Sequence, residues 1–113
     1  MRENKFADLS MLFAVNALEL TNFIKEHNAL KNQFERSATS ICANIREANY
    51  AQSKADFLSK LHIALKLCYS TEYWLELFVK TSIVEVQKVK DLLHDCGEIR
   101  HITERSGHRA PRG

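Results

Sequence analysis

Residues 37–48 read SATSICANIREA, and residues 53–57 follow as SKADF. Ile41 and Ile45 lie four residues apart, on one face of a helix. Serine, alanine and asparagine fill neighbouring positions where an amphipathic helix usually carries leucine. Small side chains let two helices approach closely. This segment therefore predicts helix packing and assembly rather than chemistry.

The composition favours one all-α domain. A chain of 113 residues, 45% hydrophobic and 27% charged, is enough for one core. Before Ser106, Gly97 is the only strong helix breaker, because Pro111 and the other glycines lie in the last seven residues. A β-rich fold would need turn residues that are missing. We expect a helical domain over 1–106 and a short, basic, disordered tail over 107–113.

Apolar residues recur every three to four positions and predict helices over about 4–26, 30–51, 54–80 and 82–106. Short connections between long helices predict an antiparallel up-down-up-down four-helix bundle. The expected core stripe of the third helix comprises Phe57, Leu61, Ala64, Cys68, Thr71, Leu75 and Phe78. In the first helix, Met11, Leu12, Val15 and Leu18 widen the apolar stripe, so we expect that helix to pack on two sides.

Local signals set the expected helix ends. Ser53 and Asp56 form a capping box with Asp in place of Glu. Thr81 or Ser82, with Glu85, offers a further amino-terminal cap. His27-Asn28 suits the end of the first helix, because Asn28 tolerates the left-handed conformation. The fourth helix is expected to bend or fray near Gly97.

The second helix carries a polar face made of Ser37, Ser40 and Asn44. These residues weaken a helix interior because they compete for backbone hydrogen bonds. Their clustering predicts close contact with another helix, and a solvated face is the alternative. They are candidate oligomer or helix-packing residues.

The sequence shows no clear pattern of a catalytic or metal-binding site. His94, Asp95 and Cys96 would diverge around a helix, and the remaining histidines lack a partner at ligand spacing. Glu72 and Glu76 form a like-charged pair of a solvated stripe. We predict no enzyme, no cofactor and no metal. Cys42, Cys68 and Cys96 are expected to be buried free thiols, and with no membrane span or signal peptide they indicate a cytoplasmic protein.

Tyr69, Tyr73 and Trp74 form an aromatic group on the third helix. With Lys66 and Lys80 nearby, this surface could stack nucleic-acid bases. A helix–helix or subunit contact with polar tips at its rim is the favoured interpretation.

Net charge argues against a strongly basic domain. The chain carries +2, but residues 105–113 contain three arginines and no acid, so the rest sums to −1. The tail could lie along a phosphate backbone, weakly in one chain and more strongly when repeated around an oligomer. A merely solubilising tail is the alternative.

Several motifs, matching in order over nearly the full length, resemble the bacterial four-helix-bundle family encoded by intervening sequences of 23S rRNA genes. They are Asn32-Gln33-Phe34, Arg36-Ser37, Thr39-Ser40-Ile41, Ala43 to Ala48, Ser53-Lys54, Asp56-Phe57, Lys60-Leu61, Ile63 to Lys66 and Tyr73-Trp74-Leu75. Cys42, Leu67 and Ser70 depart from the family pattern. Retroelement accessory variability determinant proteins are more distant relatives.

The resemblance implies a bundle that associates as a ring, a homopentamer, without known catalytic activity. It also implies nucleic-acid binding, since the retroelement relatives use a positive ring surface for this. Our preferred hypothesis is an oligomeric accessory protein that binds structured RNA or other nucleic acid. A protein-interaction scaffold is the alternative. The candidate phosphate contacts are Arg36, Arg46, Lys54, Lys60, Lys66, Arg105, Arg109 and Arg112.

Overall fold

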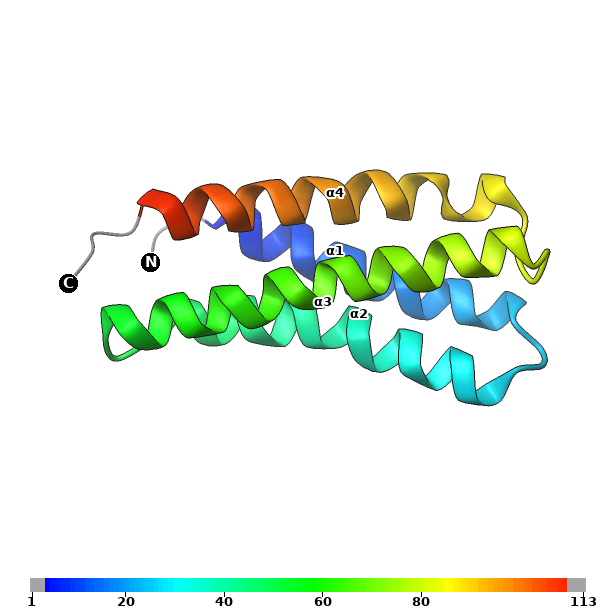
Figure 1. The fold of residues 1–113 in the computed structure, drawn as a ribbon, viewed down its shortest axis with the longest axis horizontal. Helices are drawn as coiled ribbons and strands as arrows, with labels where there is room; N and C mark the ends of the chain where they lie inside the picture. The colour runs from blue at the N-terminus through cyan, green and yellow to red at the C-terminus, as the bar shows by residue number, and fades with distance from the viewer. Residues whose placement is uncertain (1–3, 110–113) are drawn as a thin grey trace.

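The computed structural model describes the backbone of residues 4–109 and side chains as far as Gly107. The elements are α1 (Lys5–Leu20), the short 3-10 helix η1 (Thr21–Phe23), α2 (Asn28–Asn49), α3 (Lys54–Lys80) and α4 (Val86–Arg109) (Figure 1). No strand occurs in this part of the chain, so the all-α prediction is confirmed.

The four helices pack side by side. The main contacts join α1 with α2, α2 with α3, α3 with α4 and α4 with α1. The α1–α2 and α3–α4 connections lie at one end of the molecule (Figure 1). The α2–α3 connection lies at the other end, together with the start of α1 and the end of α4. Groups far apart in the sequence therefore share this second end.

One hydrophobic core fills the space between the helices, with Phe13, Phe34, Ile41, Ile45, Leu75, Phe78, Val89 and Ile99 among its fully buried members. The rings of Phe34 and Phe78 meet edge to face, with centroids 5.5 Å apart. The predicted stripe of α3 is confirmed from Leu61 to Phe78, whereas Phe57 is half-buried because it lies in the first turn.

The contact between α2 and α3 has a polar pair at its centre. Ser37 Oγ of α2 lies 2.7 Å from Thr71 Oγ1 of α3, and both residues are buried. Ser37 Oγ also lies 3.3 Å from the carbonyl oxygen of Leu67. Buried hydroxyls are stable only when hydrogen-bonded. The predicted cross-helix contact thus exists at Ser37, inside a single chain.

The other two residues of that polar face behave differently. Ser40 and Asn44 are half-buried. Asn44 Nδ2 donates to the carbonyl oxygen of Ser40 in its own helix, at 2.9 Å. This hydrogen bond stays within α2, and among the described residues neither Ser40 nor Asn44 makes a side-chain hydrogen bond to another helix.

The helix ends agree with the sequence in part. Ser53 Oγ accepts from the Asp56 N–H at 3.0 Å, as predicted, while the Asp56 carboxylate accepts from Gln52 N–H rather than from Ser53. The cap predicted at Thr81 or Ser82 is wrong. Thr81 ends α3 and donates to the carbonyl oxygen of Leu77, Ser82 has φ 61°, and α4 begins only at Val86.

The first connection also differs from the sequence prediction. The α-helix of α1 ends at Leu20, well before residue 26, and η1 follows it. His27, rather than Asn28, takes the left-handed conformation, with φ 64°. Ile24 follows η1 with an extended backbone and is still buried in the core.

Helix α4 is longer than expected. It continues through Gly97 and Gly107 to Arg109, three residues beyond the expected end at 106. A glycine costs only about 1 kcal/mol in a helix, so packing of the preceding turns overrides it. The expected disordered tail otherwise falls on residues 110–113, outside the described part.

Helix α1 has an uncovered apolar side. Met11, Leu12, Val15 and Leu18 are each 44–52% exposed. Met11, Val15 and Leu18 follow the i, i+4, i+7 spacing of one helix face. We call these four residues the α1 stripe. The prediction that α1 packs on two sides is met on one side only within a single chain.

Replacing Ser37 tests the close approach of α2 and α3. Ser37→Leu should destabilise the fold by about 1–3 kcal/mol, because a larger side chain at this buried site forces the helices apart. Ser37→Ala should cost less, since the Thr71 hydroxyl can turn to the Leu67 carbonyl of its own helix. Urea denaturation followed by circular dichroism measures both. Equal stability of Ser37→Leu and the wild type would contradict close packing of α2 against α3 at this position.

Candidate nucleic-acid and subunit surfaces

The basic side chains of α2 lie on its solvent side. Arg36 and Arg46 are both exposed, and neither makes an ion pair within the described residues. Both positions are therefore open to an anionic partner. Arg46 also lines a cleft between α2 and α1.

That cleft is open to solvent, with a volume of about 800 Å³. It lies between the start of α1 and the last turns of α2. Lining residues include Lys5, Met11, Cys42, Arg46 and Tyr50. Met11 belongs both to the cleft and to the α1 stripe, so one continuous surface combines apolar and basic groups.

The lysines of α3 are not equivalent. Lys54 and Lys66 are exposed. Lys60 Nζ instead lies 3.0 Å from Glu47 Oε1 of α2, and this hydrogen bond, more than the charge of Glu47 alone, raises the pKa of Lys60. Lys60 therefore pairs with Glu47 of α2. Because its charge already has a partner, Lys60 is the weakest of the predicted phosphate contacts.

The candidate cations form no single patch. Lys54 begins α3 and Arg105 lies near the end of α4, so both occupy the end that holds the α2–α3 connection (Figure 1). Arg36 and Lys66 lie nearer the middle of their helices. For Arg109 the structure gives only the helical backbone, and Arg112 lies outside the described residues.

The aromatic group of α3 is partly exposed. Tyr69 and Tyr73 are 51% and 55% exposed, while Trp74 is half-buried against the core. The rings of Tyr73 and Trp74 meet edge to face, with centroids 5.0 Å apart. The Arg100 guanidinium of α4 lies 5.3 Å from the centroid of Tyr69. Trp74 thus packs inside the chain, and the two tyrosines face solvent.

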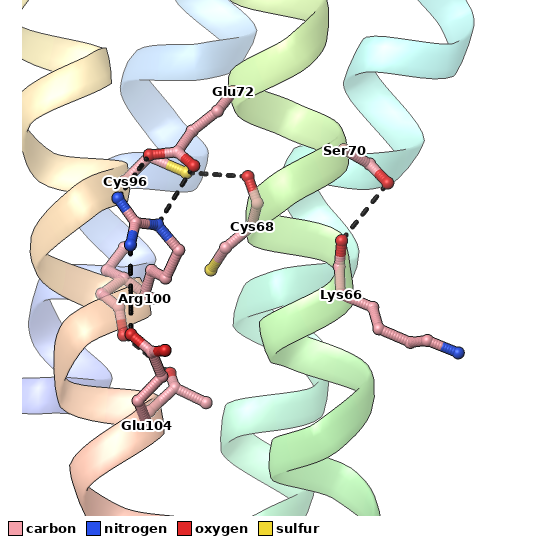
Figure 2. A network of polar contacts seen from close by, with 9 residues as sticks. Lys66, Cys68, Ser70, Glu72, Cys96, Arg100 and Glu104 are labelled. Atoms are coloured by element: carbon pink, nitrogen blue, oxygen red, sulfur yellow. Dashed lines mark hydrogen bonds and ion pairs between the residues drawn. The ribbon is translucent and has the colours of Figure 1, made fainter.

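Arg100 links α3 and α4 through an ion pair that the sequence pattern did not reveal (Figure 2). Its Nε lies 3.1 Å from Glu72 Oε1, and its Nη2 lies 3.3 Å from Glu72 Oε2. Glu104 Oε1 lies 3.9 Å from the other guanidinium nitrogen. The interpretation of Glu72 as part of a solvated stripe is therefore wrong. Its spacing from Arg100, in a different helix, gave no local signal.

The cysteines divide into two environments. Cys68 and Cys96 are buried, and the Cys96 thiol donates to the Cys68 carbonyl oxygen at 3.5 Å (Figure 2). This contact with Cys68, followed by burial, raises the pKa of the Cys96 thiol. Such thiols are poor nucleophiles. Cys42 is half-buried at the cleft.

His94, Asp95 and Glu98 bring their ligand atoms within 4.8 Å of one another on α4. His94 Nε2 lies 3.2 Å from Glu98 Oε1. Cys96, the third residue weighed in the sequence, is buried instead. The cluster lies on one helix and is largely exposed, and such groups are common without an ion.

Comparison with known proteins identifies close similarity. The family model described as 23S rRNA-intervening sequence protein matches residues 2–105. A crystal structure of a protein of unknown function from the S23 ribosomal protein family of Bacteroides thetaiotaomicron is 40% identical, with a TM-score of 0.84. The match covers 90% of this chain and 97% of that one. No curated protein matches. Among the described helices, none combines the length and apolar character needed to cross a membrane.

Asp95 yields a pH prediction. Burial raises the pKa of its carboxyl; His94 opposes the shift, and Glu98 and Asp91 add to it. Because the folded-state pKa exceeds the unfolded one, the charged form opposes folding at neutral pH, and this opposition fades as pH falls through the folded-state pKa. Asp95→Asn should therefore raise the urea midpoint at about pH 7 and lose that advantage near pH 3.

Glu76→Gln is the control for Asp95→Asn, because it removes an exposed carboxylate from α3. It should leave the urea midpoint nearly unchanged at both pH values. A lower midpoint for Asp95→Asn at neutral pH would mean that the carboxylate makes a net stabilising contact.

Proposed function

The chain belongs to the family of 23S rRNA-intervening sequence proteins, and on this premise we propose that it is a non-enzymatic, oligomeric accessory protein that binds nucleic acid, preferentially structured RNA. The observation that carries the proposal is the set of exposed cations on two neighbouring helices. Arg36, Arg46 and Lys66 make no ion pair within the described residues. Unpaired surface cations are free to neutralise phosphates.

Self-assembly is the second part of the proposal. The α1 stripe leaves four large apolar side chains half exposed on one helix. Contiguous apolar patches of this kind mark interaction sites. We assign the stripe to contact with a second copy of the chain, and the adjoining cleft at Met11 offers space for a partner side chain. The resemblance to ring-forming relatives favours a homopentamer.

The helix order supports the bundle topology expected for a ring subunit. Successive helices begin at alternate ends of the molecule (Figure 1). We therefore interpret the fold as an antiparallel up-down-up-down four-helix bundle. The bundle has four long side faces. In a closed ring two of them can contact the two neighbouring subunits, and the others remain available for a ligand.

Repetition explains how a weakly charged subunit could bind RNA. Outside residues 105–113 the chain sums to −1, so one subunit offers few net contacts. A ring repeats each contact on one rigid body. Once RNA is bound to one subunit, its effective concentration at the neighbouring subunits is raised. Arg105, at the end of α4, would be repeated around the same assembly.

A protein-interaction scaffold is the alternative function. The near-neutral body and the Lys60–Glu47 pair both reduce the attraction for phosphate. A scaffold would bind a protein partner and respond only weakly to salt in the presence of nucleic acid. Under either function the three free thiols suit a reducing compartment, and we propose a cytoplasmic location.

The oligomer prediction is tested at Val15. Val15→Glu should convert an assembly several times heavier than 13.0 kDa into a monomer, because it places a charge in the apolar contact. Light scattering coupled to gel filtration measures the mass. Val86→Glu is the control, since Val86 is 55% exposed against 46% for Val15 but lies on α4. A wild-type monomer would refute the assembly.

The nucleic-acid prediction is tested by salt dependence. Fluorescence anisotropy with a hairpin RNA and a duplex DNA should show affinity that falls as salt rises from about 50 to 200 mM, because binding releases counterions. Arg36→Gln with Arg46→Gln should weaken binding and lower the salt slope by about two. Lys60→Gln should change binding less, because Glu47 already holds that lysine. Absence of binding at the lowest salt would remove the proposal.

A further inference from the structure

A polar and aromatic strip runs along the solvent side of α3. Its members recur every three or four residues, which places them on one helix face. They are His62, Lys66, Tyr69, Tyr73, Glu76 and Lys80, and all are exposed. Figure 2 shows Lys66 extending away from Arg100 and α4. We call these residues the α3 strip.

Both tyrosine rings of the α3 strip are held in place. Arg100 approaches the ring of Tyr69 at 5.3 Å, and Glu72 holds that guanidinium through two hydrogen bonds. Tyr73 meets Trp74 edge to face, and Trp74 is itself packed on the core. A ring that is already ordered loses little conformational entropy when a ligand stacks on it.

The spacing of the rings defines the ligand. Four residues along a helix span about 6 Å, nearly twice the ~3.4 Å rise between stacked nucleotides of one strand. A strand that placed neighbouring bases on Tyr69 and Tyr73 must therefore be locally unstacked. Paired bases in a duplex offer no such face, whereas loops and single strands do.

The charges around the rings suit a phosphate backbone. Lys66 lies three residues before Tyr69, and Lys80 lies seven after Tyr73. Neither makes an ion pair within the described residues. Glu76 opposes a phosphate nearby, and Glu72 is already neutralised by Arg100. Aromatic rings flanked by cations are typical of surfaces that bind single strands.

We propose that the α3 strip is a stacking site for unpaired bases of RNA, with Tyr69 and Tyr73 as the stacking rings and Lys66 as a phosphate contact. This inference rests on the proposed nucleic-acid function and makes it more specific. Base stacking is thereby assigned to α3, while phosphate contacts lie on both α2 and α3. The recognition is sequence-tolerant, because every base offers a face to a ring.

The test compares labelled single-stranded RNA with duplex RNA of equal length. In the full chain, Tyr69→Ala and Tyr73→Ala should each weaken single-strand binding roughly tenfold and leave duplex binding unchanged. Tyr69→Phe and Tyr73→Phe should bind within about twofold of the wild type, since the ring remains. Lys66→Gln should lower the salt slope by about one, and Glu76→Gln should tighten binding.

Trp74 supplies an independent readout. It is the single tryptophan of the chain and contacts Tyr73, so a base stacked on Tyr73 should change its fluorescence. Titration with unlabelled single-stranded RNA should give this change in the wild type and in Tyr73→Phe. Loss of the change in Tyr73→Ala, with an unaltered circular dichroism spectrum, supports stacking.

The outcomes distinguish the inference from the proposed function. If single-strand affinity survives both alanine substitutions, the stacking site is refuted and salt-dependent RNA binding stands. If no RNA binds at low salt, both fall. If the alanine variants keep RNA affinity but form a smaller assembly or lose a bound protein partner, the α3 strip is a protein contact and the inference is overturned. Single-stranded DNA bound as tightly as RNA supports stacking but not a preference for RNA.

Discussion

The contact between α2 and α3 is the constraint on which the rest of the structure depends. Small side chains on α2 allow the two helices to meet, and the buried Ser37–Thr71 hydrogen bond fixes where they do so. Each hydroxyl would be costly to bury alone, so the pair favours one register over others. The aromatic contact of Phe34 with Phe78 then closes the same two helices farther along. Helices α1 and α4 complete the core around this pair.

The outward surfaces of the helices follow from the position of that core. Because α3 gives its apolar stripe to the core, its solvent side is left with tyrosine, lysine and histidine. Helix α1 carries more apolar residues than one core face can bury, and the α1 stripe remains outside. One face thus suits a copy of the chain and another suits a charged, planar ligand. Assembly and ligand binding can therefore occupy separate surfaces of one small subunit.

Local signals succeeded where the physical cause was itself local. The stripe of α3 from Leu61 to Phe78 and the Ser53 cap need only neighbouring residues, and both are present. The cap expected near Thr81 failed because Thr81 and Ser82 end α3 instead: Thr81 donates to the carbonyl oxygen of Leu77, and Ser82 takes the left-handed conformation. Likewise, α1 ends at Leu20 although a continuing helix would place Ile24 on the same buried face as Ala17 and Leu20, so helical periodicity did not locate this end.

By itself the sequence determined that the chain is helical, which faces point inward and where the small residues gather, because helical periodicity is written into neighbouring positions. Only the tertiary structure decided which polar groups find each other across helices. In the folded chain Glu72 pairs with Arg100, Lys60 with Glu47 and Ser37 with Thr71. The partners of these pairs lie 13 to 34 residues apart in the chain. The tertiary structure also separated half-exposed Tyr69 from half-buried Trp74. Such partners depend on the rotation and register of whole helices, which the summed packing of the core sets and no short stretch encodes.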